Sequence, residues 1–306
     1  MAETATAPAL SPQAELVKGL VDAGIHFGHP ASRWNPKMKQ YIHGKRGNVH
    51  IIDVRATVKG LLLAKRLVAQ TVASGKDVLF VGTKRQARTA VEEHALRAGM
   101  HSVSERWLGG TLTNFRTIRQ RLSRLEQLEK LWASGEIDTY SKKMKATLGR
   151  EKTKILTNLA GIRRMEKLPG LMFVIDTRRE HIAVKEAKKM GVKTIALIDS
   201  DSDPDLIDLP IPGNDDAMRA IEIIMKELCD AAIDGKQGRA AQEAKHVGSE
   251  ERKRSVRTRF KAEDGKEAPL GSETQMDGPA GDAPSAPATG AATTGAPAAD
   301  APAASV

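Results

Sequence analysis

The sequence has 306 residues, which is long enough for a packed core and allows one large domain or two smaller ones. Its 48 Lys and Arg outnumber its 38 Asp and Glu, so a polyanion such as nucleic acid is the first class of partner to consider. The lone cysteine, Cys229, excludes an intrachain disulfide and a zinc–cysteine cluster. Residues 1–13 lack a secretory pattern and no apolar run approaches the roughly 20 residues that span a bilayer, so we expect a cytoplasmic protein without a membrane role.

Short, nearly continuous apolar runs predict strands that are buried on both faces. The expected strands are residues 49–54, 77–82, 171–176 and 194–199, with a shorter one at 206–211. Helical patterns lie between them, at residues 57–73, 86–98, 180–190 and 215–233. Gly99 and Gly191 are placed to end two of these helices. The alternation predicts a doubly wound α/β domain with a mostly parallel sheet, built from residues 14–104 and 166–239 and preceded by a flexible segment, residues 1–13.

Residues 105–165 interrupt this alternation and are too long for an ordinary crossover. Apolar side chains recur there at steps of three and four residues in two stretches, Phe115 to Trp132 and Met144 to Met165. Turn residues at 133–138 separate the two stretches. The pattern predicts two amphipathic helices that fold back on each other as an inserted antiparallel coiled-coil hairpin.

The same insertion concentrates the positive charge of the chain. Residues 105–164 contain 14 Lys and Arg against 6 Asp and Glu. Arg116, Arg119, Arg121 and Arg124 follow one another with no acidic residue before Glu126, whereas a solvated coiled-coil face usually mixes both signs. We therefore expect this surface to contact phosphates.

Residues 240–306 are predicted to form a disordered, low-complexity tail. Beyond Lys266 the sequence is dominated by Ala, Pro, Gly and Thr, which lack the apolar side chains that offset the entropy of ordering. The basic cluster at 252–257 either binds RNA or is simply solvated, and the sequence leaves both open.

Three segments combine cations with features suited to RNA. Residues 33–46 interleave cations with aromatic rings, and the alternative for Trp34 and Tyr41 is that they anchor this loop to the core. At 82–86 a glycine and two cations precede a helix, where an anion is favoured; the anion belongs to RNA or to a nucleotide, and no dinucleotide or P-loop fingerprint supports a nucleotide. The predicted RNA-binding residues are Arg33, Trp34, Asn35, Lys37, Lys39, Lys45, Arg46, Lys84, Arg85, Arg106, Asn114, Arg116, Arg119, Arg121 and Arg124.

The junction at residues 106–115 links the sheet domain to the insertion. Its paired glycines, Gly109 and Gly110, permit a sharp turn of the backbone. Thr111 or Thr113 is expected to cap the helix that follows, and Trp107 is expected to be a packed side chain rather than a platform for a base.

A metal site is a second hypothesis. If the loops meet at the carboxyl edge of the sheet, His29, Asp199 and Asp215 offer ligands for one zinc or magnesium ion, and no other cofactor is required. The alternative is structural, in which Asp203 begins a turn before Pro204 and Asn214 or Asp215 caps the last helix.

Taken together, several strings resemble the bacterial small-subunit ribosomal protein of the S-two family over about residues 16–239. The strings are residues 24–29, 33–38, 80–84, 106–114, 173–176, 202–205 and 211–216. The resemblance implies a flavodoxin-like α/β domain with a coiled-coil hairpin. It also implies small-subunit ribosomal RNA and other small-subunit proteins as partners, support of assembly and translation, and attachment of the messenger-capturing S-one family protein.

Two other classes of function are weaker. Asp53 and Asp176 end predicted strands, where α/β enzymes place working groups, but no catalytic motif accompanies them and a fold does not imply an activity. A protein-binding adaptor would need a second apolar stripe along the hairpin, and the sequence shows none. We therefore expect an architectural RNA-binding protein that is not an enzyme and takes no small-molecule substrate.

Overall fold

The computed structural model describes residues 12–263, with side chains for residues 14–240. The chain falls into two compact units, with the boundary after Arg252. Residues 1–11 of the predicted flexible segment, 1–13, lie outside the described residues, and its last two residues are the start of helix α1 (Pro12–Asp22).

The main sheet has five parallel strands in the order β5-β4-β6-β7-β8. The strands are β4 (Val78–Val81), β5 (His101–Val103), β6 (Leu171–Ile175), β7 (Lys193–Ile198) and β8 (Leu209–Pro212). In chain order this is the arrangement 2-1-3-4-5 of flavodoxin-like sheets, with its topological switch point between β4 and β6. The prediction of a doubly wound, mostly parallel sheet is confirmed.

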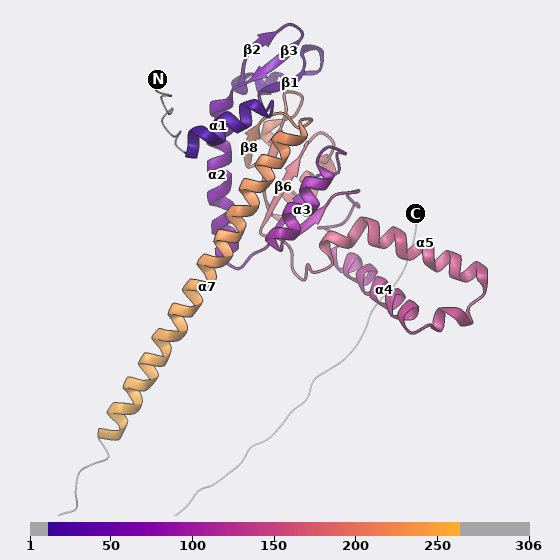
Figure 1. Cartoon of the computed structure of the whole chain (residues 1–306), viewed down its shortest axis with the longest axis vertical. Coiled ribbons are helices and arrows are strands. Elements are labelled where there is room, and N and C mark those ends of the chain that lie inside the picture. Colours follow the sequence, from indigo (N-terminus) through magenta and orange to yellow (C-terminus); the bar gives the residue numbers. More distant parts are fainter. Residues whose placement is uncertain (1–11, 264–306) are drawn as a thin grey trace, which may run out of the picture. The chain divides into compact units, whose positions relative to one another are not determined.

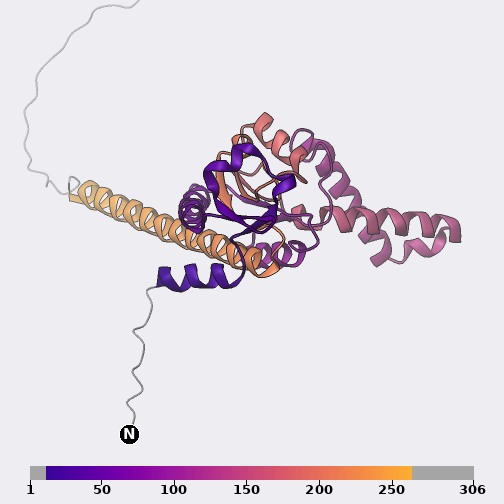
Figure 2. The same ribbon diagram turned by 90° about the horizontal axis from the view of Figure 1, so that it is seen from above.

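Successive residues of each strand point to opposite faces, and each face builds its own core. Phe80 and Phe173 lie on one face, which α1, α2 (Val54–Ala73), α3 (Arg88–Ala98) and the first part of α7 (Met218–Glu263) cover (Figures 1 and 2). Leu79 and Val174 lie on the other face, under α6 (His181–Met190). Gly99 and Gly191 end α3 and α6 in the left-handed conformation, as predicted.

The segment predicted as the first strand of the parallel sheet belongs elsewhere. Residues Val49–Ile52 form β3, the centre of a separate antiparallel sheet between β1 (Phe27–Pro30) and β2 (Ile42–Arg46). Three of its four residues are only half-buried, unlike the fully buried β4 and β6. The prediction was wrong because a short β-branched run does not reveal whether one face or both are covered.

The arm, residues 105–165, contains the two predicted helices, α4 (Phe115–Ala133) and α5 (Lys142–Leu159). The chain reverses through a short 3-10 turn between them, and the helices pack against each other (Figure 1). Leu122, Leu125 and Ile155 belong to the same apolar cluster as the second face of the sheet. The arm is therefore seated on the sheet by a continuous core.

The predicted disorder of residues 240–306 is contradicted over its first part. Helix α7 continues to Glu263, far beyond its predicted end at residue 233. Residues 240–263 are rich in Ala, Glu, Lys and Arg, which are good helix formers, so low hydrophobicity there did not mean the absence of a helix. Residues 264–306 of the predicted tail lie outside the described residues.

Candidate functional sites

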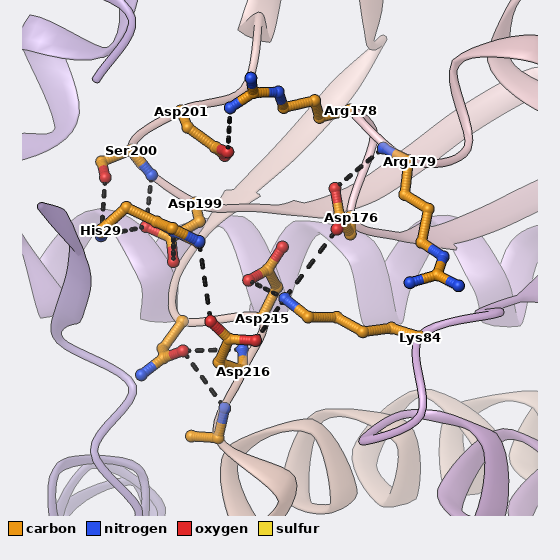
Figure 3. A network of polar contacts seen from close by, with 12 residues as sticks. His29, Lys84, Asp176, Arg178, Arg179, Asp199, Ser200, Asp201, Asp215 and Asp216 are labelled. Atoms are coloured by element: carbon orange, nitrogen blue, oxygen red, sulfur yellow. Dashed lines mark hydrogen bonds and ion pairs between the residues drawn. The ribbon is translucent and has the colours of Figure 1, made fainter. Parts of the chain in front are cut away.

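Polar side chains gather at the carboxyl edge of the main sheet (Figure 3). His29 comes from β1, Asp199 follows β7, and Asp215 follows β8. Ligand atoms of these three residues all lie within 4.8 Å of one another. The structure thus brings together the three residues proposed from sequence as metal ligands. With Lys84, Asp176 and Asp216 they form what we call the polar cluster.

Asp199 fixes the position of His29. The Nδ1 atom of His29 lies 2.7 Å from Asp199 Oδ2, and the backbone N–H of His29 donates to the Ser200 hydroxyl at 2.9 Å. The hydrogen bond to Asp199 raises the pKa of His29 to about 9, against the lowering effect of burial. The imidazole is therefore held against the Asp199 carboxylate.

Asp215 is buried and only partly satisfied. Its exposed fraction is 1 %, and its Oδ2 atom has no hydrogen-bond partner among the described residues. Burial raises the pKa of the Asp215 carboxyl to about 7, even though Lys84 acts in the opposite direction. A buried carboxylate oxygen without a partner is costly, so this atom is a site where a cation would be stabilised.

Lys84 points into this cluster and away from the solvent. Its ammonium lies 2.8 Å from Asp215 Oδ1 and 2.6 Å from Asp216 Oδ1, and its side chain is only 12 % exposed. The partners come from the loop after β8, more than a hundred residues away in sequence. Lys84 is thus a counter-charge within the protein, whereas its neighbour Arg85 is exposed and has no ion pair in the described part of the chain.

The two aspartates that suggested an enzyme have structural partners. Asp53 caps α2 by accepting the Arg55 N–H at 2.9 Å. Asp176 has a positive φ of 65°, a conformation that Asn and Asp tolerate better than most residues, and accepts the Arg179 N–H at 3.1 Å. Both side chains therefore serve to shape the turns after β3 and β6.

The loop between β1 and β2 is tied to the acidic loop after β7. Lys37 lies 2.8 Å from Asp203 and 2.7 Å from Asp205, and Asp203 begins the predicted turn before Pro204 by accepting the Asp205 N–H. Tyr41 packs on the core, and Trp34 is half-buried with its ring 5.1 Å from that of His50. These contacts support the anchoring interpretation of the two rings. Among the cations of residues 33–46, four are exposed and have no ion pair in residues 14–240: Arg33, Lys39, Lys45 and Arg46.

Of the two residues predicted to cap α7, Asn214 and Asp215, the structure selects Asn214. The Asn214 side chain accepts the N–H groups of Asp216 and Ala217, at 2.8 and 3.2 Å. Asn214 therefore serves this helix end, which allows Asp215 to join the polar cluster.

A glutamate that sequence reasoning missed clamps the junction loop, residues 106–114. Glu186 of α6 accepts hydrogen bonds from the Trp107 indole at 3.2 Å and from the Gly110 and Leu112 N–H groups at 2.7 and 3.0 Å. It also accepts both the N–H and the hydroxyl of Thr113. Burial favours a higher pKa for Glu186, but these hydrogen bonds outweigh it and hold the pKa below its ordinary value.

The prediction that Thr111 or Thr113 caps α4 was wrong, because both hydroxyls bind elsewhere. The Thr113 hydroxyl donates to Glu186, and the Thr111 hydroxyl donates to the Leu108 carbonyl. Asn114 occupies the N-cap position, and its side chain makes no capping hydrogen bond. Trp107 is packed, as expected, with an exposed fraction of 7 %. The only signal that could have pointed to Glu186 is a carboxylate on the apolar face of a short helix.

The cations of the arm differ from Lys84 in their exposure and in their partners. Arg106, Arg116 and Arg121 are exposed and have no ion pair within the described residues. Arg119 donates to the Met165 carbonyl at 3.1 Å, and Arg124 Nε lies 3.3 Å from Glu151 Oε1. Asn114 accepts the Thr117 hydroxyl at 2.8 Å. Much of the positive charge on the arm is therefore not compensated by the residues that the structure describes.

Comparison with known proteins places the chain in a family. The family model described as ribosomal protein S2 matches residues 20–235. A small ribosomal subunit protein uS2 of Rhodopirellula baltica is 60 % identical over 222 residues, which is 72 % of this chain and 85 % of that protein. A protein of the same name from Syntrophobacter fumaroxidans is 49 % identical over 221 residues, 72 % of this chain and 81 % of that protein. The chain belongs to the ribosomal protein S2 family.

Membership confirms the resemblance and the class of function predicted from the sequence. Proteins of the ribosomal protein S2 family are structural and non-enzymatic, so the chain is not an enzyme. The polar cluster, the junction loop and both helices of the arm lie inside the matched range, and residues 236–306 lie outside it. Within residues 12–263, no helix has the length and apolar character that crossing a membrane requires.

Proposed function

We propose that this chain is a structural constituent of the small ribosomal subunit that binds small-subunit ribosomal RNA through the arm and through basic loops of the α/β domain, and so supports subunit assembly and translation. Its place is cytoplasmic, as that of bacterial ribosomes is. In this proposal residues 14–104 and 166–239 form the α/β domain and residues 105–165 act as an inserted coiled-coil hairpin. The observation that carries it is the group of arm arginines that have no carboxylate partner in the described part of the chain.

The proposed mechanism is neutralisation of phosphates. Cations that have no internal partner release counterions from RNA when they bind, which gives affinity and fixes how RNA segments lie against the protein. The proposed contacts are Arg33, Lys39, Lys45, Arg46, Arg85, Arg106, Arg116, Arg119, Arg121 and Arg124. Trp34, Asn35 and Asn114 are close in sequence to these cations and complete the proposed surface. Lys37 and Lys84 leave the set, because each already pairs with two aspartates of the chain. Arg124 stays in it, because its single contact with Glu151, at 3.3 Å, is exposed and such a pair contributes little.

The test is the salt dependence of binding to small-subunit rRNA fragments. Replacing Arg116, Arg119, Arg121 and Arg124 with Gln should weaken binding and lower the slope of log K against log salt by about one unit for each phosphate that is no longer neutralised. The matched control removes four exposed lysines of the α6 region, K185Q/K188Q/K189Q/K193Q. An unchanged slope in the arginine variant, or an equal reduction in the control, would contradict the proposal.

We also propose a partner for the acidic loops after β7 and β8, the messenger-capturing S-one family protein. Support comes from the acidic side chains that these loops place at one edge of the α/β domain. Asp205 and Asp216 pair with Lys37 and Lys84, yet their side chains remain 65 % and 51 % exposed. Small ribosomal subunits that contain the D205N/D216N variant should capture less of the S-one family protein than subunits that contain wild type. Equal capture would argue against this surface.

A divalent metal ion is a second proposal for the polar cluster, although the family is not one that requires a cofactor. His29, Asp199 and Asp215 supply an imidazole and two carboxylates, a donor set that suits zinc and, less well, magnesium. The Oδ2 atom of Asp215, unpartnered among the described residues, supports it. Metal analysis of the purified chain should then find one zinc ion that is absent from His29→Ala, and a folded protein free of metal would overturn it.

A further inference from the structure

A groove of about 770 Å3 lies at the root of the arm, between α4, α5 and the junction loop. Figure 1 shows the two helices that bound it. Its apolar lining comes from Leu108 in the junction loop and from Ile155 and Leu159 on α5. Ile155 and Leu159 are also members of the core that joins the arm to the sheet, so this side of the groove is firmly held.

Four cations from both helices stand around this apolar lining. Arg121 and Arg124 come from α4, and Arg150 and Lys154 come from α5. Arg124 pairs with Glu151, which also lines the groove, at 3.3 Å. The other three have no ion pair among residues 14–240, in contrast to Lys37 and Lys84 in the α/β domain. The groove therefore carries an excess of positive charge beside an apolar surface.

This combination suits an unpaired nucleotide better than a duplex. An A-form helix presents phosphates but hides the faces of its bases, whereas an extruded nucleotide offers a flat base together with two phosphates. The base covers apolar surface and stacks on a guanidinium plane, and the phosphates accept from the cations. The volume lies within the range of about 300 to 1000 Å3 that holds small ligands, so one nucleotide fits.

We propose that the groove at the root of the arm binds one nucleotide extruded from an RNA strand, with its base against Leu108 and Ile155 and its phosphates held by Arg121, Arg150 and Lys154. The proposal rests on the proposed function, that the arm binds RNA. An acidic peptide would also satisfy the charge, but it offers no flat rings for the guanidinium groups. RNA is therefore the occupant that the three arginines favour.

The experiment titrates the full chain with two RNA hairpins that differ only by a single-nucleotide bulge of 2-aminopurine, whose fluorescence reports stacking. Wild type should bind the bulged RNA about tenfold more tightly than the fully paired one, with a change in 2-aminopurine emission. R150Q/K154Q should lose most of this preference. K142Q/K143Q, which removes the same charge from exposed positions at the start of α5 and away from the groove, should keep it.

The outcomes separate the two proposals. Strong, salt-dependent and equal binding of both RNAs by wild type overturns the groove proposal and leaves RNA binding by the arm standing. Binding of neither RNA overturns both. An equal loss of preference in the two double variants shows that general charge produced it, and tighter binding of an acidic peptide of glutamate and tyrosine than of the bulged RNA assigns the groove to a protein; either result overturns the groove proposal.

Discussion

The carboxyl edge of the main sheet and the arm both collect charge, but they use it in different ways. At the edge, Lys37 and Lys84 pair with aspartates of the same chain. On the arm, Arg116 and Arg121 have no such partner in the described residues. A cation that is already paired within the protein gains little free energy from binding a phosphate, because the internal ion pair must first be broken. Which cations bind RNA is therefore decided by what the fold places beside them.

The largest effect is expected where the two regions are joined. Glu186→Ala removes the acceptor of four N–H groups in the junction, so the free energy of unfolding should fall by about 3 kcal/mol or more. Urea unfolding measures this decrease. The control is Lys185→Ala, an exposed neighbour on α6, which should change stability by less than about 0.5 kcal/mol. A decrease in Glu186→Ala no greater than that of the control would show that the clamp does not hold the arm.

A smaller decrease is expected at the polar cluster. Lys84→Met leaves Asp215 buried without its counter-charge, and stability at neutral pH should fall by about 2 kcal/mol, limited because Asp215 can take up a proton. The salt slope of rRNA binding should stay unchanged. A lower slope in this variant would mean that Lys84 contacts phosphate, which would break the contrast between the two regions.

The pH dependence of the junction follows from the lowered pKa of Glu186. A carboxyl whose pKa is lower in the folded state stabilises the protein fully above its ordinary value of 4.5, and that contribution is lost as the pH falls through the folded value. The stability difference between wild type and Glu186→Gln should therefore be constant near neutral pH and shrink below about 4.5. Urea midpoints of both proteins across this range measure it, and a difference that grows on acidification would reverse the assigned sign.

The smallest effect is expected for Arg85, the residue next to Lys84. Arg85→Gln removes an exposed cation that has no partner in the described chain, so stability should be unchanged. The salt slope for rRNA should fall by about one unit. If Arg85→Gln and Lys84→Met give the same slope, internal pairing does not decide which cation meets RNA.

Much of the fold could be predicted because its signals are local. The buried runs of β4, β6 and β7 and the apolar period of α4 and α5 are properties of neighbouring residues. The meeting of Asp199 and Asp215 could also be anticipated, since loops that follow parallel strands share one edge of the sheet. This reason does not extend to His29, which lies on β1 of the separate antiparallel sheet.

What could not be predicted depends on partners distant in sequence. Lys84 and Arg85 are adjacent cations, yet within the described residues only Lys84 is paired, because it alone meets the loop after β8. Nothing beside Glu186 in the sequence distinguishes it from other glutamates, because its role comes from N–H groups of the distant junction loop. The β-branched run of β3 was likewise misplaced, since its strand partners, and not its own residues, decide which sheet it joins.

Sedimentation with small ribosomal subunits across a range of salt concentrations tests most directly whether unpaired arm cations hold this chain on RNA. Wild type should travel with the particles at moderate salt and be released as salt rises, and R116Q/R119Q/R121Q/R124Q should be released at clearly lower salt, while Lys84→Met should follow wild type. Release of the arginine variant at the same salt as wild type would contradict the account.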